Sequence, residues 1–149
     1  KDVRDKVTAF IGRHSMSSGN PRYLIRPVNA VVGLYPIKLP DHPTSIVLVE
    51  GMFDLLNMYD KGARNVVCVF GTTKLYSDTA SKLLPFKVMG VQKIFILFDG
   101  DEAGKNAAEK TKPLIEECGF TVEIINLPDG TDPGDLDSEY VTSIIEYTK

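Results

Sequence analysis

Acidic residues stand at the ends of apolar runs in this sequence. Glu50 closes the run 46–50, "IVLVE", and Asp54 follows four residues later. Asp99 and Asp101 come directly after a second apolar run, in "KIFILFDGDEAG". A third acidic segment, "LPDGTDPGDLD", carries Asp129, Asp132, Asp135 and Asp137. Carboxylates brought close together repel one another unless some are protonated or a cation lies between them.

These side chains are typical of a site for a hard divalent cation. Oxygen ligands without a histidine or cysteine partner favour Mg²⁺ or Mn²⁺ over zinc. We expect Gly100 to allow a sharp turn between two acids and Gly104 to let a ligand approach closely. Two plainer interpretations stay open: Asp54 could face solvent, and the acids could form an idle rim. Glu102 fits a helix-start acid better than a ligand.

The elements that must position these acids follow from the hydrophobic pattern. Short β-branched runs alternate with longer helical patterns from Ser45 onward. The runs predicted as strands are 46–50, 65–70, 93–99 and 121–127, and the helical patterns lie at 51–62, 77–90, 101–119 and about 138–148. The first three strand runs are continuously apolar, as in parallel strands covered on both faces. Pro85 should interrupt or end its helix, and Pro113 should kink its own.

This alternation predicts an α/β fold with an open, mostly parallel four-stranded sheet and helices on both faces. Ligands bind such sheets at the carboxyl ends of the strands. If the first and third strands are neighbours, Glu50, Asp54, Asp99 and Asp101 share one crevice.

The first 44 residues have a different character. They are turn-rich, with only short strand candidates such as 7–12 and 31–37. We expect residues 1–44 to be a small β-rich segment and residues 45–149 to be the main domain. The chain begins with Lys1 and no methionine, which suggests a fragment of a larger protein.

Charge is distributed unevenly between the two parts of the chain. The net charge is −3, but residues 1–49 carry seven Lys/Arg against three Asp/Glu, and residues 50–149 carry ten against seventeen. The first part is a candidate anion contact and the second a candidate cation site, although both could be solvated surfaces. No apolar run approaches the roughly 20 residues of a membrane span, and Cys68 and Cys118 form no CxxC pair. We therefore expect a cytoplasmic protein with no membrane partner and reduced cysteines.

Two motifs and one loop resemble the Toprim catalytic domain. "VLVEGMFD" resembles the family's strand that ends in an invariant glutamate, and "FDGDEAG" resembles its DxD motif, about fifty residues later. "CVFGTTK" is similar to the Gly-Thr loop between them. DnaG-type primases, type IA and type II topoisomerases, RecR proteins and OLD-type nucleases share this domain.

Within the family, the primase branch fits best. "EGMFD", "DGDEAGKNAA" and "LPDGTDPGDL" are similar to primase motifs, and "TAFIGRHSMSSGNPRYL" resembles the end of the primases' basic N-terminal subdomain. The third motif departs from the usual Asp-Pro-Asp, because Gly134 separates Pro133 from Asp135. The chain also lacks the upstream zinc-ribbon cysteines and an obvious helicase-binding bundle. These departures suggest the catalytic core of a divergent bacterial or phage-encoded primase.

The resemblance implies a nucleotidyltransferase that makes short RNA primers on single-stranded DNA during replication. Asp99 and Asp101 would hold Mg²⁺ or Mn²⁺ against the phosphates of a ribonucleoside triphosphate. Asp54, Asp132 and Asp135 would complete one or two metal sites. Glu50 would be the general base that accepts the 3′-hydroxyl proton, or alternatively a metal ligand. A replicative helicase would be contacted through parts outside this chain, at the replisome on the nucleoid.

Basic side chains are candidates for phosphate contacts. Arg13, Arg22 and Arg26 could bind phosphates of template or nucleotide, because a guanidinium offers a fixed fork of donors. Lys74 in the Gly-Thr loop and Lys105 beside the DxD motif are weaker candidates. Two other functions stay open at this point: an OLD-like Toprim nuclease, and a RecR-like DNA-binding module without catalysis.

Overall fold

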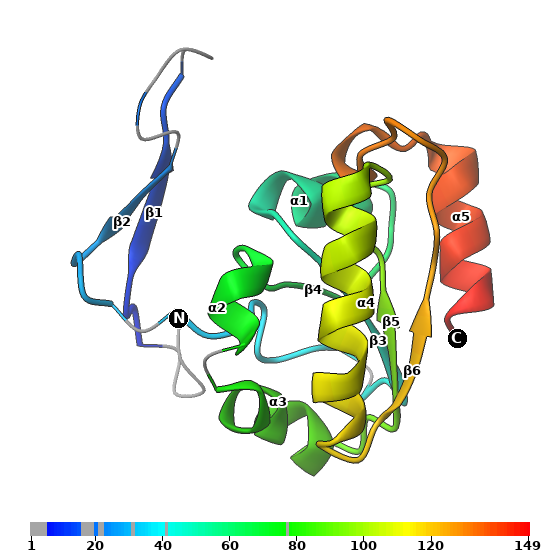
Figure 1. Ribbon diagram of the computed structural model, residues 1–149, viewed down its shortest axis with the longest axis horizontal. Coiled ribbons are helices and arrows are strands. Elements are labelled where there is room, and N and C mark those ends of the chain that lie inside the picture. Colours follow the sequence, from blue (N-terminus) through cyan, green and yellow to red (C-terminus); the bar gives the residue numbers. More distant parts are fainter. Residues whose placement is uncertain (1–5, 16–19, 21–22, 31, 41, 77) are drawn as a thin grey trace. The chain divides into compact units, whose positions relative to one another are not determined.

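The computed structural model describes residues 6–15, 20, 23–30, 32–40, 42–76 and 78–149 (Figure 1). The chain divides into two compact units, Lys1–Gly33 and Leu34–Lys149. No helix in the described part of the chain is long and apolar enough to cross a membrane.

The larger unit is built on a four-stranded parallel sheet. Its strands are β3 (Ser45–Val49), β4 (Val66–Cys68), β5 (Lys93–Ile96) and β6 (Thr121–Ile124). They lie in the order β4-β3-β5-β6, and every neighbouring pair is parallel. The predicted α/β fold with an open parallel sheet is thus confirmed. Strands β3 and β5 are direct neighbours, with Val47 opposite Phe95, so the residues that follow them leave the sheet side by side.

Helices cover both faces of this sheet, because successive strand residues point to opposite sides. The helices of this unit are α1 (Met52–Asp60), α2 (Thr72–Tyr76), α3 (Thr79–Val88), α4 (Glu102–Glu116) and α5 (Ser138–Tyr147), with the 3₁₀ turn η1 (Pro133–Asp135). Ile46 and Leu48 pack in one core cluster with residues of α2, α3 and α4. Val47 and Val49 pack in a second cluster with residues of α1 and α5. In Figure 1, α4 runs across the near face of the sheet.

The two prolines inside helices do not stop them. The prediction that Pro85 interrupts or ends its helix is wrong, since α3 continues to Val88. A proline removes one backbone hydrogen bond and strains one turn. Leu83 and Phe86, both fully buried in the core, anchor the same turn to the sheet and offset that cost. Helix α4 likewise continues beyond Pro113 to Glu116.

The smaller unit contains an antiparallel hairpin of β1 (Phe10–Arg13) and β2 (Tyr23–Arg26). The first strand overlaps the predicted candidate at 7–12. The second candidate, 31–37, is wrong, because its described residues make only an isolated bridge from Tyr35 to Cys68. Leu34, at the start of the larger unit, is instead buried in that unit's core. The assignment of residues 1–44 to a separate functional segment stays a prediction.

The core packing leads to a stability prediction. Phe86→Ala should lower the free energy of unfolding by about 3–5 kcal/mol, because it removes a fully buried aromatic side chain and leaves a cavity. Leu84→Ala on the same helix, where the side chain is 57% exposed, should change it by no more than about 0.5 kcal/mol. Urea unfolding followed by circular dichroism measures both values. Equal losses for the two variants would contradict this assignment of the buried face.

Candidate metal centre

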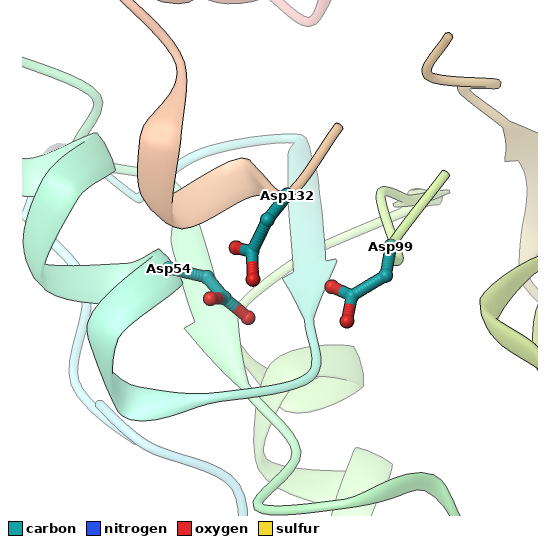
Figure 2. A group of neighbouring side chains, drawn as sticks. All are labelled: Asp54, Asp99 and Asp132. Atoms are coloured by element: carbon teal, nitrogen blue, oxygen red, sulfur yellow. The ribbon is translucent and has the colours of Figure 1, made fainter. Parts of the chain in front are cut away.

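Three aspartates from distant parts of the sequence lie together beyond the carboxyl ends of β3 and β5. One carboxylate oxygen from each of Asp54, Asp99 and Asp132 lies within 4.8 Å of the other two. Figure 2 shows the three carboxyl groups turned toward a common point. We call these residues the aspartate triad. All three were among the metal ligands predicted from the sequence.

Asp54 is held in the first turn of α1. The backbone N–H of Gly51 donates to its Oδ2 at 2.7 Å, and the side chain is only 6% exposed. A Cβ at residue 51 would lie 3.2 Å from that oxygen, so glycine leaves room for this close approach. The sequence pattern Glu50-Gly51-x-x-Asp54 thus turns the strand end directly into a helix whose first turn presents a carboxylate.

Asp132 is held by the 3₁₀ turn that it begins. Its Oδ1 accepts a hydrogen bond from the Gly134 N–H at 2.6 Å, and its backbone carbonyl accepts one from the Asp135 N–H at 2.9 Å. The turn η1 contacts α1. Asn57 of α1 donates from Nδ2 to the carbonyls of Pro133, at 2.9 Å, and Leu136, at 3.0 Å.

Asn57 was not predicted from the sequence. An asparagine three residues after Asp54 looks like any polar residue on a helix surface, and no motif distinguishes it. The carbonyls that Asn57 binds lie more than seventy residues away in the sequence. The contact therefore could not be found from the sequence, because only the fold brings these groups together.

Asp99 follows β5, and two glycines close to it are required by packing. A Cβ at Gly100 would lie 2.1 Å from the Pro128 carbonyl oxygen, and one at Gly104 would lie 2.2 Å from the Asp99 carbonyl oxygen. The Gly100 N–H also donates to the Thr131 carbonyl at 2.8 Å. Neither glycine has a positive φ. The chain does bend at Gly100, as expected, and close backbone packing is a further requirement for glycine at both positions. Ligand approach at Gly104 stays a prediction.

Glu50 lies beside the triad but is not a member of it. The backbone N–H of Asp99 favours the ionised form of the Glu50 carboxylate, and the Glu50 backbone carbonyl accepts a hydrogen bond from the Gly71 N–H at 3.1 Å. Burial, followed by the charges of Asp99, Asp54 and Asp101, raises the pKa of Glu50 to about 7. A carboxyl group with this pKa can exchange a proton at neutral pH.

Burial and mutual repulsion raise the pKa values of two members of the triad. Burial and the charges of Asp132 and Asp99 raise the pKa of Asp54 to about 7, against the lowering effect of the Gly51 N–H. Burial, then Asp132 and Asp101, raises the pKa of Asp99 to about 6. The charged groups that raise these pKa values are other carboxylates, which repel one another when ionised.

The remaining predicted acidic ligands lie outside the triad. Asp101 is exposed and caps α4, its Oδ1 accepting from the Gly104 N–H at 2.7 Å. It is still close enough to raise the pKa of Asp99. Asp135 is exposed at the end of η1. A direct ligand role for Asp101 or Asp135 stays a prediction, and Glu102 is the first residue of α4, as expected for a helix-start acid.

The basic candidates are dispersed. Lys105 forms an ion pair with Asp129 and lines a shallow pocket that also includes Asp99. Lys74 lies in α2. In the smaller unit, the Arg13 guanidinium lies 5.8 Å from the centre of the Tyr23 ring, and Arg26 donates to the Ile25 carbonyl at 3.3 Å. Arg22 lies outside the described residues.

The triad fits a hard divalent cation. Two oxygens on opposite sides of Mg²⁺ lie about 4.2 Å apart when each is about 2.1 Å from the ion. Three carboxylate oxygens within 4.8 Å of one another can reach this arrangement with small side-chain movements. The donor set is oxygen only, which suits Mg²⁺ or Mn²⁺ rather than zinc.

Comparisons with known proteins agree with this geometry. Residues 47–137, which include the whole triad, match the family described as Toprim-like. The chain is 36% identical over 148 residues to a DNA primase of Aquifex aeolicus, covering 94% of this chain and 29% of that protein. It is 31% identical over 142 residues to a DNA primase of Clostridium acetobutylicum, covering 91% and 23%. The chain therefore spans less than a third of either curated relative.

Solved structures show the same likeness. The crystal structure of the Aquifex aeolicus primase, comprising its zinc-binding and RNA polymerase domains, has a TM-score of 0.79 at 29% identity, covering all of this chain and 39% of that one. A DNA primase domain from Pseudomonas aeruginosa has a TM-score of 0.75 at 27% identity, covering 97% and 48%.

The raised pKa of Asp54 predicts a pH-dependent stability. The pKa is about 7 in the folded protein against an ordinary value of 3.8, so this carboxyl stabilises the fold below about pH 4. That contribution is lost as the pH rises toward 7. Asp54→Asn should therefore raise the free energy of unfolding at pH 8 in EDTA by about 1–2 kcal/mol, and by less at pH 5.

Thermal unfolding at the two pH values measures this effect. Saturating Mg²⁺ at pH 8 should stabilise the wild type more than Asp54→Asn. Glu109→Gln, an exposed acid within α4, is the control and should show neither effect. An Asp54→Asn protein that is less stable than wild type at pH 8 in EDTA would contradict the electrostatic assignment.

Packing at Gly104 predicts a second effect. Gly→Ala within a helix ordinarily stabilises a protein by up to about 1 kcal/mol. Gly104→Ala should instead displace the backbone of Asp99 and weaken Mn²⁺ binding by about tenfold or more, as measured by electron paramagnetic resonance. Gly33→Ala, where an added Cβ meets no heavy atom within 4 Å, should leave binding unchanged. Unchanged Mn²⁺ affinity in Gly104→Ala would show that this contact does not position Asp99.

Proposed function

The chain belongs to the Toprim-like family, and on that premise we propose that it is the catalytic core of a DNA primase, a nucleotidyltransferase that makes short RNA primers on single-stranded DNA. The aspartate triad is the observation that carries the proposal, because nucleotidyl transfer needs a divalent cation beside the reacting phosphate. Similarity to DNA primases over more than nine tenths of the chain supports this branch of the family.

Asp54, Asp99 and Asp132 are the residues that would hold Mg²⁺ or Mn²⁺. When bound, the ion offsets phosphate charge and helps to align the 3′ oxygen with the phosphorus that it attacks. Asp101 and Asp135 lie close by and would take part through water or on binding of the nucleotide.

Glu50 has the role of general base in this proposal. Its carboxylate stands beside the triad and has a pKa of about 7. It can therefore accept the proton of a 3′-hydroxyl at neutral pH. A role as metal ligand is the alternative for this residue.

Phosphate recognition would come from the basic residues. Arg13, Arg22 and Arg26 supply positive charge in the segment 1–44, and Lys74 and Lys105 lie in the catalytic domain 45–149. Lys105 is paired with Asp129, which is 91% exposed at its side chain, so a phosphate could replace that partner at low cost. Template DNA and ribonucleoside triphosphates are the proposed partners, with a helicase contacted elsewhere in a cytoplasmic replisome.

Two substitutions test the division of roles between Glu50 and Asp99. Glu50→Gln should reduce ribonucleotide incorporation on a single-stranded template at least about a hundredfold, with Mn²⁺ affinity largely retained. Asp99→Ala should abolish both ribonucleotide incorporation and Mn²⁺ binding. Gel analysis of labelled primers and Mn²⁺ titration by electron paramagnetic resonance measure the two properties.

Asp60→Ala, an exposed acid at the end of α1, is the control and should leave both properties unchanged. Wild-type protein that makes no primers, or substitutions that leave synthesis intact, would refute the proposal. Metal-dependent nicking without synthesis would indicate a nuclease, and DNA binding that survives loss of the triad without any activity would indicate a binding module.

A further inference from the structure

We propose that Asn57 is a positioning residue that sets the separation between Asp54 and Asp132 by fastening η1 to α1. The inference rests on the proposed metal site, but it concerns a residue that contacts none of the reacting groups. Asn57 makes its hydrogen bonds to backbone carbonyls on either side of the third acidic segment.

Both polar atoms of the Asn57 amide make hydrogen bonds. Both of its donated bonds come from Nδ2, to the carbonyls of Pro133 and Leu136, which bracket η1. Its Oδ1 accepts a hydrogen bond from the Lys61 ammonium, one helical turn further along α1. This third bond fixes which end of the amide faces η1, because an ammonium can only donate.

The placement of Asn57 links the two carboxylates through a short, rigid path. Asp54 and Asn57 are three residues apart and lie on the same face of α1. Pro133, whose carbonyl Asn57 binds, directly follows Asp132. The path from one carboxylate to the other thus consists of one helical turn, one side-chain hydrogen bond and one residue of backbone.

This fastening acts against a real repulsive force. One carboxylate oxygen of Asp132 lies within 4.8 Å of one of Asp54, so the two groups push α1 and η1 apart when both are ionised. A Cβ at Gly134 would lie 2.9 Å from Asp132 Oδ1 and 3.3 Å from Asp54 Oδ1, which shows how close the η1 backbone lies to both acids. A neutral double donor suits this position, whereas a carboxylate there would repel the two carbonyls.

The segment has a second anchor, so loss of Asn57 should not unfold it. Leu136 is 4% exposed and packs with Val141 and Ile144 in the cluster beneath α1 and α5. The Thr131 carbonyl is also held by the Gly100 N–H. Removing the Asn57 bonds should therefore leave the segment folded while allowing the Asp132 carboxylate to shift relative to Asp54.

The test compares Asn57→Leu with Asn65→Leu. Asn65 also donates from its amide to a backbone carbonyl, that of Ser45 at 3.5 Å, but at the opposite end of β3 from Glu50. Asn57→Leu should weaken Mn²⁺ binding about tenfold or more and alter the zero-field splitting of the bound ion. Asn65→Leu should change Mn²⁺ affinity less than about twofold, whatever its effect on the unfolding temperature in EDTA.

Lys61→Met provides a milder variant should Asn57→Leu fail to fold. It removes only the partner that orients the amide, and it should weaken Mn²⁺ binding a few-fold. Unchanged Mn²⁺ affinity and spectrum in Asn57→Leu, or in Lys61→Met where the first variant is not folded, would overturn the role of Asn57. Equal weakening by Asn65→Leu would show a general loss of stability instead and would also overturn it.

Failure of the proposed metal site gives a different result. In that case wild-type protein would bind Mn²⁺ no better than Asp99→Ala. Failure of primer synthesis alone would leave Mn²⁺ binding by the wild type intact and would not bear on Asn57. Binding by the wild type that Asp99→Ala removes and Asn57→Leu leaves intact would retain the metal site and refute the positioning role alone.

Discussion

Repulsion among closely packed carboxylates is the constraint on which the rest of this structure depends. Asp54, Asp99 and Asp132 come from three segments, and Glu50 stands beside them. Asp54, Asp99 and Glu50 would ionise more readily in water, because burial and like charges both disfavour their ionised forms. The clustered acids destabilise the fold locally, and burial of the apolar core on the two faces of the sheet offsets this destabilisation. Such an arrangement is typical of a functional site that lowers the stability of its own fold.

The acids are held by neutral donors and by close packing. The backbone N–H groups of Gly51 and Gly134 bind Asp54 and Asp132 respectively, and that of Asp99 favours the ionised form of Glu50. A lysine or arginine in the same places would neutralise the cluster and leave no need for a cation. Backbone donors fix the geometry and keep most of the negative charge available for a metal. Gly100 and Gly104 complete this design by letting backbone segments approach where a Cβ would collide.

The loop that carries Asp132 depends on the larger fold more than the other two segments do. Asp54 lies in the first turn of the helix that follows β3, and Asp99 lies three residues beyond the end of β5, so the parallel pairing of these two strands brings them together. Asp132 arrives from beyond β6 and is held by η1, by Asn57 and by the Gly100–Thr131 hydrogen bond. If these contacts set the position of Asp132, changes in this loop alone would alter the metal affinity of the site. The other two ligands would stay where the order of the strands places them.

The sequence by itself determined the parallel sheet, the helices on both faces and the edge at which the acids gather. Continuous apolar runs indicate strands covered on both sides, and residues that follow parallel strands must leave at one edge. It did not determine the second strand of the hairpin, since β2 is short and exposed and depends on its partner. Only the tertiary structure decided that Asp132 joins Asp54 and Asp99 while Asp101 caps a helix. The reason is physical. Asp101 accepts a hydrogen bond from a backbone N–H only three residues away, whereas membership of the triad depends on distances between residues far apart in the sequence.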